Sequence, residues 1–258
     1  MEERKITVSN ILFCVIFLLF TLFFVVPFFY GLYLSFTNLS GVTQNYEYIG
    51  FDNYRNIFND TRVLNSLQVS FRYLCLLLPA SLIFGYLNAK VLHRLRKTKS
   101  AALFISFLPY LTMPVVASLL FSQLYYRFFT SIGEVFNIEF LKINLLASSN
   151  TALYAVALVD LWMLVPFSTL LFFSAMDAIP INLVNASKLD GAKNIRAFIH
   201  IKLPYLLPTI GTLTIILIVY AFTYIDTIMS LTSGGHSEAQ KHFFMLSIEI
   251  QSLTAGMV

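Results

Sequence analysis

The chain has 258 residues, of which 58% are apolar, 16% are aromatic and only 12% are charged. Soluble domains carry about 25% charged residues, so this composition excludes an ordinary soluble protein and indicates a membrane protein. The net charge of +4 is compatible with nucleic-acid binding, but excess Lys and Arg is also typical of cytoplasmic loops of membrane proteins, so the positions of the charges decide.

Five apolar runs are long enough to cross a bilayer, which requires about 20 mostly apolar helical residues. They cover residues 11–36, 66–92, 101–126, 151–175 and 205–231. The sequence therefore predicts an all-α, polytopic membrane protein. Prolines in these runs predict kinks or helix starts. Cys14 and Cys75 lie inside apolar runs, so neither a disulfide framework nor a metal site is indicated.

Basic residues gather on one side of the predicted spans: before the first, in the loop 93–99, and in the loop 177–203. The positive-inside rule predicts that these segments and the N-terminus are cytoplasmic. This placement explains the basic charge without a nucleic-acid partner. The chain closes on "SLTAGMV", which resembles the approach to a further span. A natural five-span protein and a chain cut short after Val258 both remain open, and the absence of a polar tail favours the second.

The loop 177–203 contains the stretch "NASKLDGAKNIRAFIHIKLP", residues 185–204. Pro180 is suited to the first turn of a helix, and Leu183, Ala186 and Asp190 recur at helical spacing. Asp190-Gly191 is a turn signal that predicts the end of this helix, and a second short helix is expected over 194–200. The alternative is a plain connecting loop whose charges only set the topology.

The order of these residues resembles the cytoplasmic loop of permease subunits from binding-protein-dependent ABC importers. That family's pattern is Glu-Ala-Ala-x-x-Asp-Gly-Ala, followed by Phe-x-x-Ile-x-Leu-Pro-x-Leu-x-Pro. Matching positions are Ala186, Asp190, Gly191, Ala192, Phe198, Ile201, Leu203, Pro204, Leu206 and Pro208. Asn185 replaces the usual Glu and Ser187 the second Ala, so a salt bridge from position 185 is lost while a small side chain is kept at 187.

Further stretches resemble the sugar-permease branch of this family, which contains maltose-type and glycerol-phosphate-type permeases. They include "YIGFDNYRNIF" at 48–58, "LWMLVPFSTLLFFSAMDAIP" at 161–180 and "YIDTIMSLTSGG" at 224–235. The resemblance covers residues 10–250 and implies a single transmembrane permease domain over 1–258 with the type I importer fold. It also implies six spans, so a sixth is expected beyond Val258.

The resemblance implies a non-catalytic subunit that binds no cofactor itself. Its expected partners are a homologous second permease, two cytoplasmic ATPases that use ATP and Mg, an extracytoplasmic solute-binding protein, a carbohydrate and the lipid bilayer of a bacterial plasma membrane. Residues of the 181–203 loop would dock on an ATPase as a coupling helix. The expected coupling residues are Leu183, Asn185, Ala186, Ser187, Lys188, Leu189, Asp190, Gly191, Ala192 and Phe198.

Asp160 is the candidate for the solute pathway, because it lies about 15 Å of helix rise into the fourth span and an ionisable residue at that depth faces a partner or a water-filled path. Trp162, the only Trp, follows closely, and Tyr220, Thr223, Tyr224 and Asp226 are expected to line the outer path. The alternatives are a structural hydrogen bond for Asp160 and ordinary packing for Trp162.

Two other functions predict different features of the sequence. An ion-gradient-driven secondary transporter or channel would require several deep charges or inverted repeats, and a membrane enzyme would require clustered catalytic groups. Neither explains the loop motif. The absence of a deep Arg or Lys favours a neutral or weakly charged sugar.

Overall fold

The computed structural model describes residues 2–39, 46–95, 98–138, 145–146, 149–180, 182–183, 185, 194–223 and 226–232. Within these ranges the chain is helical, and the extended pairing consists of one bridge between Thr37 and Tyr48. The predicted all-α class is therefore confirmed for this part of the chain. The chain divides into two compact units, one containing residues 1–65 and the other beginning at Ser66.

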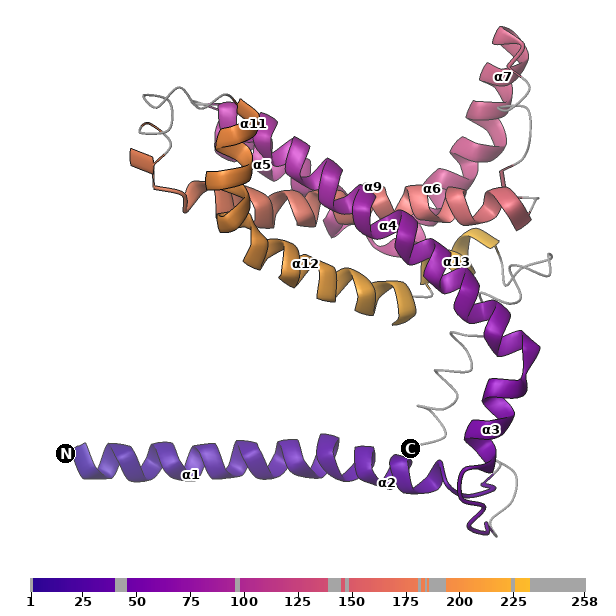
Figure 1. The fold of residues 1–258 in the computed structure, drawn as a ribbon, viewed down its shortest axis with the longest axis vertical. Coiled ribbons are helices and arrows are strands. Elements are labelled where there is room, and N and C mark those ends of the chain that lie inside the picture. Colours follow the sequence, from indigo (N-terminus) through magenta and orange to yellow (C-terminus); the bar gives the residue numbers. More distant parts are fainter. Residues whose placement is uncertain are drawn as a thin grey trace. The chain divides into compact units, whose positions relative to one another are not determined.

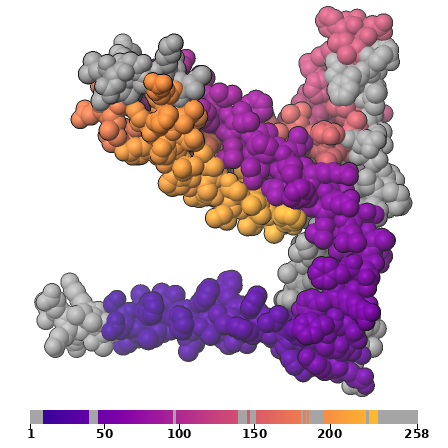
Figure 2. All heavy atoms as spheres, in the orientation of Figure 1, coloured from indigo at the N-terminus to yellow at the C-terminus, as the bar shows by residue number. Residues whose placement is uncertain are grey.

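The first unit begins with a long helical rod (Figure 1) made of α1 (Glu2–Phe20), a π-helical turn (Thr21–Val25) and α2 (Val26–Leu34). Pro27 lies in the first turn of α2, where a missing N–H is tolerated, and the π-turn before it absorbs the change in hydrogen bonding. The rod supplies a candidate span over Ser9–Leu34, and none of its most apolar window is buried. Figure 2 shows its indigo side chains standing out along its length.

A short helix, α3 (Asp52–Asn59), lies in the first unit before the second long helix begins. The chain reaches it through a turn at Gly50, whose φ of +62° lies in the left-handed region that glycine tolerates best. Asp60 is the single residue between α3 and α4 (Thr61–Arg94). It accepts a hydrogen bond from the Arg62 backbone N–H at 2.8 Å and thereby caps α4.

The second unit is organised around α9 (Ser149–Asp177), whose apolar window is 61% buried, against 22% for α4 and for the candidate span Phe198–Thr223. α9 packs against α12 (Leu203–Thr223). On α4 a stripe of mostly small residues is buried at intervals of three or four. Its members are Ser66, Ser70, Tyr73, Leu77, Ser81, Gly85, Ala89 and Leu92. Small side chains let helix backbones approach closely in membranes.

α4 and α9 approach each other closely at Gly85. A Cβ atom built on Gly85 would lie 2.6 Å from the Cβ of Ser168, a separation that side chains do not adopt. Three residues further on, the Asn88 amide donates to the hydroxyl oxygens of Ser106 at 2.9 Å and of Thr169 at 3.3 Å. Glycine at 85 therefore permits the contact that these hydrogen bonds then fix.

The predicted third span, 101–126, is a bent pair of helices rather than one straight helix. The first limb is α5 (Lys99–Phe107) with a 3-10 turn (Leu108–Leu111), and the second is α6 (Pro114–Gln123), a π-turn (Leu124–Phe129) and α7 (Thr130–Phe136). The limbs meet at 89°. Met113 is extended, with ψ of 135°, because the ring of Pro114 disfavours the helical region for the residue before it.

The predicted fifth span, 205–231, is also two helices. α12 ends at Thr223, and α13 (Asp226–Thr232) follows and packs against α6. At its other end α12 continues directly from α11 (Asn194–Ala197) and a π-turn (Phe198–Lys202). The short helix expected over 194–200 is present as α11 and the π-turn, and it runs directly into α12, because Pro204 lies in the first turn of α12, where proline is tolerated. Among the described residues, four helices are long and apolar enough to cross a membrane, or up to five spans if the bent pair counts as one.

Candidate functional site

Asp160 on α9 lies at the centre of the second unit, with only 2% of its surface exposed. Its carboxyl accepts a hydrogen bond from the Tyr73 hydroxyl of α4 and another, at 2.9 Å, from the Tyr220 hydroxyl of α12. The carboxyl therefore joins three helices. We call these three residues the Asp160 cluster.

The surroundings of the Asp160 cluster are apolar. Buried side chains pack around it from α4, α6, α9, α12 and α13. They include Leu77, Ala117, Val156, Val159, Met163, Leu217, Ala221 and Ile228. Five residues before Asp160 on α9, the Ala155 carbonyl oxygen accepts a hydrogen bond from the Tyr125 hydroxyl at 2.8 Å. Low local polarity strengthens hydrogen bonds and makes any unpaired polar group costly, so the two tyrosine donors are what Asp160 requires in this position.

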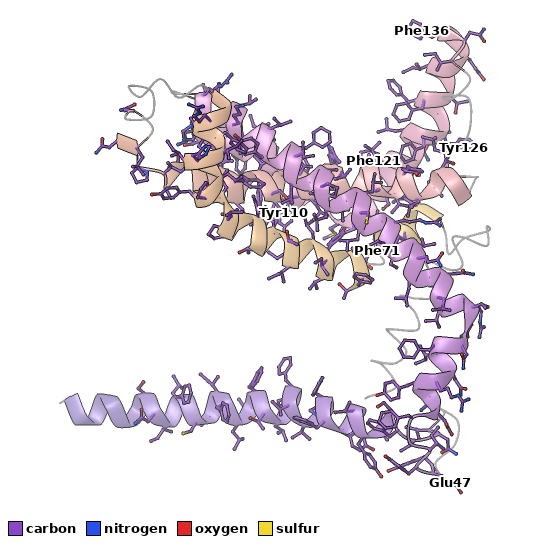
Figure 3. All side chains as sticks on the ribbon, in the orientation of Figure 1. Glu47, Phe71, Tyr110, Phe121, Tyr126 and Phe136 are labelled. Atoms are coloured by element: carbon purple, nitrogen blue, oxygen red, sulfur yellow. The ribbon has the colours of Figure 1, made fainter. Side chains whose placement is uncertain are left out.

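Trp162 does not join the Asp160 cluster, although it is two residues away. Two residues correspond to about 200° of helix rotation, and Trp162 is 38% exposed with its indole edge against the ring of Phe121, at a centroid distance of 5.4 Å. Phe121 comes from α6 and is labelled in Figure 3. Trp162 and Asp160 therefore lie on different sides of α9.

The remaining pathway candidates have different settings. Tyr220 belongs to the Asp160 cluster, whereas the exposed Thr223 donates its hydroxyl to the Val219 carbonyl oxygen of its own helix at 2.7 Å. Asp226 is exposed in the first turn of α13, and Tyr224 lies outside the described residues.

A second polar cluster ties together the ends of α4, α5 and α9. The Lys99 ammonium donates to both Asp177 carboxylate oxygens, at 2.8 and 2.7 Å, and His93 Nε2 lies 3.0 Å from the same carboxylate. Phe173 packs against this cluster. The Lys99 ammonium lies 4.5 Å from the centroid of the Phe173 ring, and the His93 and Phe173 rings form an edge contact. This group, the Asp177 cluster, holds the last turn of α9, three residues before Pro180.

Of the expected coupling residues, the structure describes Leu183, Asn185 and Phe198, and the others, Ala186 to Ala192, lie outside the described residues. Leu183 and Asn185 are both exposed. Phe198 is partly buried and packs on Tyr86 of α4, with ring centroids 5.2 Å apart. The chain beyond the loop is thus anchored to the same helix as the Asp177 cluster.

The sequence interpretation missed Tyr73, Lys99 and Asp177. Tyr73 carried a signal, since it is a polar side chain deep in a predicted span, but its partner is 87 residues away and no spacing rule links them. Lys99 and Asp177 are charges at span ends, a position typical of topology signals, so their pairing had no distinct sequence mark.

Comparison with known proteins gives a consistent result. Residues 78–256 match the family described as "Binding-protein-dependent transport system inner membrane component". The multiple sugar-binding transport system permease protein MsmF of Streptococcus mutans is 31% identical over 213 residues, 83% of this chain and 73% of that protein. The sn-glycerol-3-phosphate transport system permease protein UgpA of Pectobacterium atrosepticum is 27% identical over 217 residues, with the same two coverages.

A further relative is the arabinooligosaccharides transport system permease protein AraP of Bacillus subtilis, which is 29% identical over 77% of this chain and 64% of its own length. Among solved structures, a chain of a bacterial ABC transporter involved in the import of alginate superposes with a TM-score of 0.77 at 17% identity, over 99% of this chain and 89% of that one. This likeness supports the type I importer fold that the loop motif predicted.

Proposed function

The chain belongs to the family of binding-protein-dependent transport system inner membrane components, and on that premise we propose that it forms half of the translocation pore of an ATP-driven carbohydrate importer. The family match over residues 78–256 is the observation that carries the proposal. It also favours an ATP-driven permease over the ion-gradient-driven transporter or channel.

Carbohydrate is the proposed solute class because relatives are named for sugars, arabinooligosaccharides and glycerol phosphate. Asp160 is the one acidic or basic side chain among the buried residues of the described ranges. A pathway without a buried cation suits a neutral sugar better than an anion, which would usually be met by Arg or Lys. Trp162, partly exposed beside Phe121, offers an aromatic surface against which a sugar ring could lie.

For coupling, we propose that the loop after α9 docks on a cytoplasmic ATPase subunit, which holds and hydrolyses ATP with Mg while this chain binds neither. Two such ATPases, a second permease and an extracytoplasmic solute-binding protein complete the importer, with the N-terminus of this chain in the cytoplasm of a bacterial cell. ATP-driven closure of the ATPases would then move the permeases as rigid bodies between inward- and outward-facing states.

The Asp177 cluster supports this proposal, because it gives the loop a fixed point of departure. A displacement of the loop at Pro180 would be transmitted to the last turn of α9, because His93 holds that turn to α4 and Lys99 holds it to α5. The Phe198 contact with Tyr86 holds the return of the loop to α4. Displacement of the loop would therefore move α4, α9 and α12 together instead of being lost in a loose connection.

The test is reconstitution of the chain with its co-purifying subunits in liposomes, followed by measurement of ATP hydrolysis and solute uptake. Gly191→Trp should abolish ATP-coupled uptake, whereas Gly191→Ala, which adds one methyl group at the same position, should retain more of it. If Gly191→Trp left both assembly and ATP-coupled uptake intact, the coupling assignment would be wrong.

The energy source and the solute are tested in the same liposomes. Uptake that needs an ion gradient and persists without ATP would support the secondary-transporter alternative instead. Competition of labelled oligosaccharide uptake by sn-glycerol 3-phosphate, with no competition by neutral sugars, would overturn the neutral-sugar assignment.

A further inference from the structure

The short helix α3 has two chemically different faces. At 3.6 residues per turn, Phe51, just before the helix, and Tyr54 and Phe58 within it recur at i, i+3 and i+7 and share one side. Asp52 and Asn56 lie on the other side of the helix, and Arg55 and Asn59 lie between the two sides. Such a division is typical of helices that lie at a boundary between water and an apolar medium.

The position of α3 is fixed to the end of α2. The Asn53 amide donates to the carbonyl oxygens of Ser35 at 2.9 Å and of Thr37 at 2.8 Å. The hydroxyl groups of Tyr54 and Ser35 lie 2.7 Å apart in a hydrogen bond. The two Asn53 bonds satisfy carbonyl groups just beyond the C-terminal end of α2, where helical partners are missing. Together with the Tyr54–Ser35 bond they hold α3 at the level where the candidate span Ser9–Leu34 stops.

Aromatic side chains continue from the end of that span onto α3. The ring of Phe36 contacts those of Phe51 at 5.3 Å and Tyr54 at 5.5 Å, and it stacks on Tyr48 at 6.4 Å. Phe51 is 72% exposed and Phe58 is 73% exposed. Exposed aromatic rings that continue the exposed apolar surface of a membrane span are in the place where interfacial aromatic residues occur.

We propose that α3 is an interfacial helix whose aromatic face, formed by Phe51 and Phe58, lies in the boundary between lipid headgroups and acyl chains on the side of the membrane where α2 ends. The chain leaves one span at Leu34 and begins the next candidate span at Thr61, so α3 is tethered to the membrane at both ends. Its polar face then meets water. This contact would set the depth and tilt of the first span, whose most apolar window has no buried residue.

The test is the depth of a fluorescent probe on each face of α3. Both native cysteines, Cys14 and Cys75, are replaced by alanine, and a bimane label is attached to Phe58→Cys or to the matched Asn56→Cys on the opposite face. The full-length protein, with the subunits that co-purify with it, is reconstituted in vesicles of phosphatidylcholine and phosphatidylglycerol. Phe51→Cys provides a second probe on the aromatic face if the first variant does not fold.

We expect nitroxide lipids labelled near the headgroup to quench the Phe58 probe at least about twofold more than the Asn56 probe, and aqueous iodide to show the opposite order, as for a helix about 5–10 Å deep. Two results would overturn the proposal. Equal access of iodide to both probes would place α3 in water. Protection of the Phe58 probe from both quenchers would show that a protein surface, and not lipid, covers the aromatic face.

Discussion

The Asp160 cluster makes a sharp prediction about stability. Tyr73→Phe removes one of the two hydroxyl groups that donate to the buried carboxyl and leaves the aromatic ring in place. A hydrogen bond to a charged group contributes about 1.5–3 kcal/mol and a neutral one about 0.5–1.5, while hydrogen bonds between membrane helices average about 0.6. We therefore expect a loss of about 0.5–2 kcal/mol. Asp160→Ala leaves two hydroxyl groups without an acceptor and should cost about 2–6 kcal/mol.

The assay is thermal unfolding in detergent micelles, where about 2–4 °C of melting temperature corresponds to 1 kcal/mol for a chain of this size. Tyr73→Phe should lower the melting temperature by about 1–8 °C. Tyr154→Phe, on the exposed surface of α9, is the matched control and should change the free energy of unfolding by less than about 0.5 kcal/mol. If Tyr73→Phe and Tyr220→Phe both have the melting temperature of the control, the Asp160 cluster does not stabilise the fold. Loss of uptake with unchanged stability in Asp160→Ala would instead support a solute-binding role.

Three further substitutions test the packing and the Asp177 cluster. Gly85→Ala should lower the free energy of unfolding by about 1–3 kcal/mol, because the added methyl group would collide with Ser168. The control Gly211→Ala, with open space around the glycine, should leave that free energy unchanged or raise it by about 0.5–1 kcal/mol. Equal melting temperatures of the two variants would contradict the close contact. Asp177→Asn should lower solute uptake per ATP hydrolysed while changing stability by no more than about 1 kcal/mol, since its ion pairs are half-exposed; unchanged coupling would remove the cluster from the mechanism. Phe198→Ala should cost about 1–3 kcal/mol through loss of packing on Tyr86, and a variant as stable as the wild type would show that this contact does not hold the loop.

The family could be recognised from residues close together in the chain. The loop motif around Asp190-Gly191 is a run of residue types at fixed spacing. It can be read from the sequence because that spacing does not depend on how the surrounding helices pack. Likewise, the thickness of the bilayer requires apolar runs of about 20 residues, so the length of each apolar run predicts a span. Proline at 114 marked a break in the third run, because its effect on the preceding residue is local.

Contacts between distant segments were decided only by tertiary structure. The partners of Asp160 lie 87 and 60 residues away, and which tyrosines meet it depends on how α4 and α12 rotate and pack against α9. The same rotation turns Trp162 away from Asp160 despite their closeness in sequence, and the 89° bend in the third run depends on the helices that receive each limb. Composition and spacing record the requirements of a single segment, such as span length and helix breaks. The choice among many polar partners is made by close packing of whole helices, which no single segment encodes.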